Sequence, residues 1–181
     1  MNQGFLFMTS PRFLVTFVLI CLLISWVLRR RGSGHGRKIR QSARVLKKLA
    51  SIPHPAARLN YLRAINPYVF EELLLTAFAA LGNPISRNKR YSGDNGLDGR
   101  VKLDGKWTYL QAKRYRGYVK LEHIREFNQL CERSKQPGIF IHTGKTGSGV
   151  WKVCSPLVHV VSGENLVDFI DRAIVAKSGR G

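Results

Sequence analysis

Acidic residues are absent from the first part of this chain. Twelve Lys or Arg residues precede Glu71 and no Asp or Glu does, whereas 18 basic and 11 acidic residues occupy positions 71–181. The formal charge of the 181 residues is +19. A positive field of this size attracts polyanions, either nucleic acid or anionic lipid head groups.

Cysteine is scarce as well. Cys21, Cys131 and Cys154 lie far apart, and neither a Cys-x-x-Cys pair nor a His-Glu-x-x-His pattern occurs. Such spacing excludes a disulfide framework and argues against a zinc site. It favours reduced cysteines in a protein that faces the cytosol.

One long uncharged run stands near the start, from Phe13 to Leu28, and residues 29–31 after it are all arginine. Its 16 residues fall just short of a spanning helix, which needs about 17–25, but Arg12 can snorkel and Trp26 can lie at the interface. A cleaved signal peptide fits less well because the basic flank follows the run, and a buried core helix fits poorly beside three arginines. We expect residues 1–31 to form a single-pass anchor in the inner (cytoplasmic) membrane, with everything after it in the cytoplasm.

The rest of the chain is expected to have two parts: a basic linker with short helices over 32–65, and a folded domain over 66–177. Gly and Ser indicate an irregular linker at 29–41, followed by short helices at 42–50 and 55–65. The folded part has an α-β-β-β-α-β-β-α rhythm: a helix after Pro67, strands near 85–91, 97–103 and 106–114, a helix at 121–134, strands at 138–142 and 157–161, and a helix at 164–176. This order predicts an α/β fold with a mixed sheet flanked by helices.

The chemistry is expected on a hairpin. If Asp104–Gly105 is a two-residue turn, Asp98 lies directly opposite Gln111, and Lys113 projects from the same face as Gln111. The Asp98 carboxylate, the Gln111 amide oxygen and the Ala112 carbonyl suit a hard cation such as Mg²⁺, for which Mn²⁺ is expected to substitute.

Two further residues complete this candidate site. Glu71 on the preceding helix can supply another carboxylate to the metal, directly or through water. Lys113 can orient or help deprotonate an attacking water and stabilise charge on a phosphate. Asp and Gly are also frequent in plain turns, so the combination and spacing carry the hypothesis, not any single residue.

From Asn66 onward the chain resembles the Mrr-like restriction endonucleases of the PD-(D/E)XK nuclease superfamily. The matching pieces are NPYVFEELLLTAFAALG, SGDNGLDGRV, YLQAKRY, GIFIHTG and VVSGENLVDFI. The resemblance implies a restriction-endonuclease-like α/β/α sandwich and magnesium-dependent cleavage of DNA. It also implies catalytic roles for Glu71, Asp98, Gln111 (in place of the usual Asp or Glu) and Lys113, with Asp94 in the motif but without a defined role. The winged-helix domain often joined to this catalytic domain has no counterpart here.

The roles expected for other polar residues depend on their neighbours in the sequence. Arg114, Arg116, Lys120 and Lys145 are expected to contact DNA phosphates. His142 ends a strand and is a candidate whose role the sequence leaves open. The segment GKTGSG at 144–149 does not form a nucleotide-binding loop, because Ile139 stands where that motif needs glycine.

The sequence therefore predicts a metal-dependent DNA endonuclease held at a membrane, of a type used in restriction or by mobile elements. Cutting both strands needs two active sites, which points to a homodimer. Two alternatives stay open: a structure-selective repair or junction nuclease, and a non-catalytic membrane-bound DNA-binding protein. Preference for branched DNA would indicate the first, and binding without magnesium-dependent nicking the second.

Overall fold

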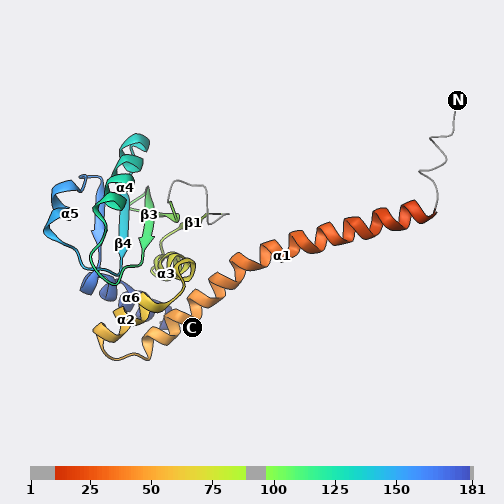
Figure 1. Ribbon diagram of the computed structural model, residues 1–181. Helices are drawn as coiled ribbons and strands as arrows, with labels where there is room; N and C mark the ends of the chain where they lie inside the picture. Colours follow the sequence, from red (N-terminus) through yellow and green to blue (C-terminus); the bar gives the residue numbers. More distant parts are fainter. Residues whose placement is uncertain (1–10, 89–96, 180–181) are drawn as a thin grey trace. The chain divides into compact units, whose positions relative to one another are not determined.

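A computed structural model describes residues 11–88 and 97–179, and for 11–14 and 26–33 it describes the backbone alone. The chain forms two compact units, Met1–Arg37 and Lys38–Gly181. The second unit contains all the described residues of the predicted site and the sheet, whose strands Figure 1 draws as arrows.

The first helix is longer than the sequence suggested. Helix α1 runs from Pro11 to Ala50 without a break, so residues 29–41 are helical and do not form the predicted irregular linker. No proline occurs between Pro11 and Pro53, and a glycine inside a helix costs only about 1 kcal/mol. The residues around these glycines include Arg, Lys, Leu and Ala, whose high helix propensity offsets this cost, so the helix continues past the glycines.

Within residues 11–88 and 97–179, no helix combines the length and the apolar character needed to cross a membrane. The structure thus lends no support to the spanning helix expected at Phe13–Leu28.

The compact unit begins earlier than the predicted domain boundary at Asn66. Val45, Leu46 and Leu49 at the end of α1 and Leu62 of helix α2 (Pro55–Ala64) are buried in the same core as the sheet. Segments expected to be linker therefore pack as part of the domain, because their apolar residues fall on one helical face.

The sheet has five strands in the order β1-β2-β3-β4-β5. They are β1 (Ile85–Arg87), β2 (Gly99–Leu103), β3 (Lys106–Lys113), β4 (Gly138–His142) and β5 (Val158–Val161). The pairs β1–β2 and β2–β3 are antiparallel, whereas β3–β4 and β4–β5 are parallel. The predicted mixed sheet is confirmed, and its central strand is the one that carries Gln111 and Lys113.

Helices cover both faces of this sheet. Helices α3 (Pro67–Ala80) and α6 (Gly163–Ser178) pack on one face, and α4 (Leu121–Ser134) packs on the other beside α5 (Ser148–Val153) (Figure 1). Strand residues alternate between the two cores: Ile139 and Ile141 join the α3/α6 side, and Phe140 joins the α4/α5 side. The α/β/α arrangement expected from the sequence fits this structure.

One element was missed. Helix α5 lies in the stretch KTGSGVWKV, whose Gly and Ser residues weakly favour helix. Val150 is fully buried against the α4 side of the core, and this tertiary contact outweighs the local preference.

Candidate active site

The β2–β3 hairpin sets the register of the site. Asp104 and Gly105 both have positive φ, 47° and 80°, as a two-residue type I′ turn requires. Leu103 pairs with Lys106 and Gly99 with Leu110. The paired register ends there, and Asp98, just outside β2, bonds to Leu110 and Ala112, so the predicted pairing of Asp98 with Gln111 is not what the described residues show.

Asp98 is held against the central strand at two points. Its amide donates to the Leu110 carbonyl (2.9 Å), and its Oδ2 accepts from the Ala112 amide (2.7 Å). The next residue must be small, because a Cβ on Gly99 would lie 2.9 Å from the Leu75 side chain of α3 and 2.9 Å from the Ser86 carbonyl oxygen. The close approach of α3 to the sheet explains the Asp-Gly pair of the motif.

Burial raises the pKa of Asp98 to about 6. The hydrogen bond from Ala112 and the positive charge of Lys113 act in the opposite direction and offset only part of this effect. Asp98 is therefore a carboxylate that the protein desolvates without fully compensating its charge.

Glu71 reaches the same place from helix α3. Asn66 caps this helix by accepting a hydrogen bond from the Tyr68 amide (3.1 Å), and Pro67 begins it. Burial, followed by repulsion from Asp98, raises the pKa of Glu71 to about 8, and Lys113 partly counteracts the shift. Glu71, Asp98 and Lys113 thus lie close enough to interact electrostatically, although they come from three separate segments of the chain.

The neighbouring acid has a different role. Glu72 is buried and accepts an ion-paired hydrogen bond from Arg87 of β1 (2.8 Å). Arg87 also donates to Thr76 (3.2 Å). This pair ties α3 to the sheet edge, and it leaves Glu71 as the acid of the Glu-Glu sequence that interacts with Asp98.

Gln111 and Lys113 lie on the other side of β3 from Leu110 and Ala112. Leu110 and Ala112 belong to the α3/α6 core, and strand side chains alternate. Gln111 is buried, whereas Lys113 is partly exposed. A partly exposed lysine beside two carboxylates can reach a bound substrate.

The donor set fits a hard divalent cation. Two carboxylates with raised pKa values and an amide are oxygen ligands, and a cation among them would relieve the repulsion between Glu71 and Asp98. The Ala112 amide faces Asp98, and the carbonyl of a strand residue projects to the same side as its amide, as the predicted ligand role requires. No group of three or more His, Cys, Asp or Glu suited to a metal occurs in the part of the chain that the structure describes.

His142 does not join this centre as a titrating group. It is fully buried at the end of β4, opposite Lys113 in the register. Its Nδ1 accepts from the Gly144 amide (3.2 Å), and its Nε2 lies 3.2 Å from the Thr146 hydroxyl. Burial lowers its pKa to about 4, so it is neutral near pH 7 and holds the turn after β4. Asp94 lies outside the described residues.

The predicted DNA contacts follow β3 in the chain. Arg116, Lys120 and Lys145 are exposed, and the Lys145 backbone pairs with the segment around Tyr118. Arg114 is partly buried and donates to the Arg63 carbonyl (2.8 Å). Sequence reasoning missed Arg63 of α2, since 51 residues separate it from Arg114 and no motif links them.

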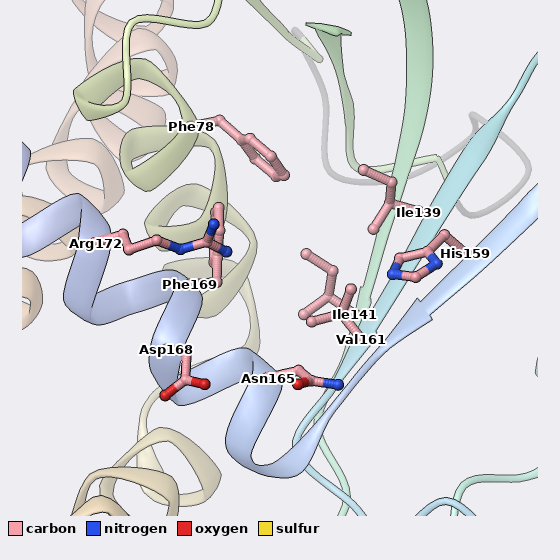
Figure 2. A pocket seen from close by; sticks show the side chains of 9 residues that line it. All are labelled: Phe78, Ile139, Ile141, His159, Val161, Asn165, Asp168, Phe169 and Arg172. Atoms are coloured by element: carbon pink, nitrogen blue, oxygen red, sulfur yellow. The ribbon is translucent and has the colours of Figure 1, made fainter.

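A separate, mostly apolar cavity of about 590 Å³ lies between the sheet and helices α3 and α6. Figure 2 shows Phe78 and Phe169 of the helices facing Ile139, Ile141 and Val161 of the strands, with Asp168 and Arg172 on α6. None of the predicted site residues lines it. This cavity is therefore not part of the candidate active site.

Comparison with known protein families identifies the chain. Residues 62–170 match the model of the Mrr catalytic domain, described as a restriction endonuclease. The match covers more than half of the 181 residues and includes α3, the whole sheet and the first half of α6. No curated protein matches the chain significantly.

Proposed function

The chain belongs to the restriction endonuclease family of the Mrr catalytic domain, and we propose that it hydrolyses DNA phosphodiester bonds in a reaction that depends on a divalent metal ion. The observation that supports this most directly is the electrostatic interaction of Glu71, Asp98 and Lys113, which come from three separate segments of the chain. Two carboxylates whose burial and mutual repulsion raise their pKa values destabilise a fold, and such perturbed groups cluster at functional sites.

Each residue has a distinct part. Asp98, Gln111, the Ala112 carbonyl and Glu71 would hold Mg²⁺ or Mn²⁺. The metal, when bound, would supply a water of lowered pKa and neutralise charge on the phosphate. Lys113 donates to the non-bridging oxygens of the scissile phosphate and orients the attacking water, so it stabilises charge that develops in the transition state.

The test is nicking of supercoiled plasmid by the full-length protein, with Mg²⁺, with Mn²⁺ and with EDTA. Lys113→Ala serves as the inactive control, because it removes the amine without removing a proposed ligand. We expect nicking by the wild type with either metal and none with EDTA. Nicking of equal rate by both proteins, or in EDTA, would rule out the proposed mechanism.

Double-strand cleavage needs two such sites, since one domain carries one. We propose that two copies act together when both strands are cut. A rate of linearisation that rises with the square of protein concentration, against a linear dependence for nicking, would support this assembly.

Membrane attachment is a separate proposal, and it rests on the amino-acid sequence near the start of the chain. Eight large apolar side chains between Val15 and Ile24 are each at least 52% exposed in α1, and three arginines follow the uncharged run. We propose that this segment meets the inner membrane and leaves the nuclease domain in the cytoplasm. Recovery of the full-length protein in the soluble fraction without detergent would overturn that location and leave the nuclease assignment intact.

A further inference from the structure

A cavity lined by arginines lies beside the end of β3. Arg63, Ala64, Arg114, Tyr115 and Arg116 surround a space of about 440 Å³, and an adjoining hollow of about 300 Å³ shares Arg63, Ala64 and Arg116. We call this space the arginine cavity. Its lining contains three cationic side chains and no carboxylate.

The arginines are held in place by neutral partners. Arg63 donates from Nε to the Thr143 carbonyl (2.8 Å) and from Nη1 to the Asn60 amide oxygen (3.0 Å). Arg114 donates from Nη1 to the Arg63 carbonyl (2.8 Å). Among the residues that the structure describes, neither these two nor Arg116 forms an ion pair.

One donor atom of Arg114, its Nε, is buried and unsatisfied among the described residues. A buried donor of a charged group without a partner is costly, because the group has lost its water. Since Arg114 lines the cavity, a ligand with acceptor oxygens there can reach this side chain.

The cavity lies at the same end of the sheet as Lys113. Arg114 follows Lys113 directly, and the Thr143 amide donates to the Lys113 carbonyl (3.2 Å). Thr143 Oγ1 in turn accepts from the Tyr115 amide (3.0 Å). Thr143 therefore joins the end of β3 to the end of β4 and, through its carbonyl, also orients Arg63.

Three like charges around one space repel one another, and the structure offers little to offset this. The carboxyl end of α2 carries about half a negative charge, which attracts Arg114 through the Arg63 carbonyl. The net charge of the cavity stays strongly positive. An anion with several acceptor oxygens satisfies it, and guanidinium groups bind phosphate through paired N–H donors.

We propose that Arg63, Arg114 and Arg116 form a subsite for one internal phosphodiester group of the DNA strand whose scissile phosphate lies at Lys113. This rests on the proposed nuclease function. A strand held at Lys113 must continue past the surrounding surface, and the arginine cavity is the adjacent cationic hollow. A terminal phosphate or free inorganic phosphate shares the chemistry, and the experiment separates these sources.

The first measurement is binding of a 20-base-pair duplex by the full-length protein in EDTA, followed by fluorescence anisotropy at several KCl concentrations. Arg116→Gln is the main variant, because Arg116 is exposed and makes no hydrogen bond to any described residue, so its loss leaves the fold intact. Arg63→Gln and the double variant complete a cycle. Arg133→Gln is the matched control, since Arg133 is exposed near the start of β4, at the other end of the sheet.

We expect each single variant to raise Kd about five- to tenfold at low salt, and the control to change it less than twofold. Because both arginines contact the same phosphate, the double variant should weaken binding by less than the product of the two factors. Its salt slope should fall by about 0.9, the value for one phosphate. The proposed subsite would be wrong if Arg116→Gln bound DNA as tightly as the control variant does. It would also be wrong if the salt slope of the double variant fell by the value for two phosphates.

The second measurement identifies the phosphate. Neutral methylphosphonates are placed one at a time along the duplex. One internal position should weaken wild-type binding and leave Arg116→Gln unaffected, while 5′-phosphorylation and millimolar inorganic phosphate should change neither. If only 5′-phosphorylation or only inorganic phosphate changes DNA binding, the ligand of the arginine cavity is a terminal or a free phosphate, and the proposal of an internal phosphodiester is wrong. Because binding is measured without metal, a wild type that never cuts DNA would defeat the nuclease function while these binding results still decide the subsite.

Discussion

Two charged regions of opposite sign adjoin Lys113: Glu71 and Asp98 interact with it, and Arg114, the next residue, lines the arginine cavity. The acidic centre, Glu71 with Asp98, concentrates negative charge in a partly desolvated place, and its pKa values rise in response. The arginine cavity concentrates positive charge, held by carbonyl groups instead of carboxylates. Neither region neutralises the other. A protein optimised for stability alone would pair such groups with each other.

The two regions are suited to different roles. The acidic centre has the chemistry to hold a cation, so damage to it should affect turnover. The arginine cavity has the chemistry to hold a phosphate, so damage to it should affect affinity. Changing one residue at a time tests whether turnover and affinity separate in this way.

The largest effect is expected for Asp98→Asn. The change removes a ligand charge at constant shape, and cleavage should fall about 1,000-fold or more, with DNA affinity in EDTA nearly unchanged. Single-turnover rates at saturating DNA, beside anisotropy, provide the measurement. Cleavage near the wild-type rate would remove Asp98 from the acidic centre.

Lys113→Ala is expected to reduce the single-turnover rate by about 100- to 1,000-fold. The amine stabilises the transition state more than the bound substrate, so Kd should change little. Lys113→Arg is the companion variant and should not restore the rate, since a guanidinium is bulkier and does not give up its proton. Should both variants cut normally and merely bind more weakly, Lys113 would belong with the arginine cavity.

Glu71→Gln should separate function from stability. The folded-state pKa of Glu71 is raised from 4.5 to about 8, so the folded protein favours the protonated form, and the metal-free fold loses stability as pH rises from about 4.5 through 8. Glutamine cannot ionise. The variant should therefore be about 1–3 kcal/mol more stable than wild type at pH 8.5 and equally stable at pH 4.

Urea denaturation in EDTA at both pH values measures this difference. Glu122→Gln, on the exposed surface of α4, is a suitable control and should be unchanged at either pH. A Glu71 variant less stable than wild type at pH 8.5 would mean that the carboxylate supports the fold. The acidic centre would then have a structural role, like that of the Glu72–Arg87 ion pair, which ties α3 to the sheet.

The smallest effect is expected for Gln111→Glu. The shape is kept and a neutral oxygen ligand becomes a charged one, so cleavage with Mg²⁺ should stay within about tenfold of wild type, with a changed ratio of Mg²⁺ to Mn²⁺ activity. Rates across a titration of each metal give the answer. Complete loss of cleavage in a folded variant would assign Gln111 a role other than ligation.

Much of the acidic centre could be predicted from the sequence, because its geometry depends on local rules. The Asp-Gly turn fixes the register of the β2–β3 hairpin, and that register brings Asp98 to the part of β3 that carries Gln111, where it bonds to Leu110 and Ala112. The alternation of strand side chains then places Lys113 beside Gln111. The bounds of α4 and β4 are also those that their apolar patterns predicted, Leu121–Ser134 and Gly138–His142.

The remaining features depend on contacts between distant segments, which local patterns do not encode. Only packing distinguishes Glu71 from Glu72, since Arg87 binds the second and leaves the first to Asp98. Burial of Val150 makes a helix of a glycine-rich stretch. The arginine cavity is the clearest case, because Arg63 meets Thr143 across 80 residues of chain. The hairpin and the residues it carries therefore follow from local sequence rules, whereas the charges around them depend on the fold, because those charges come from segments far apart in the chain.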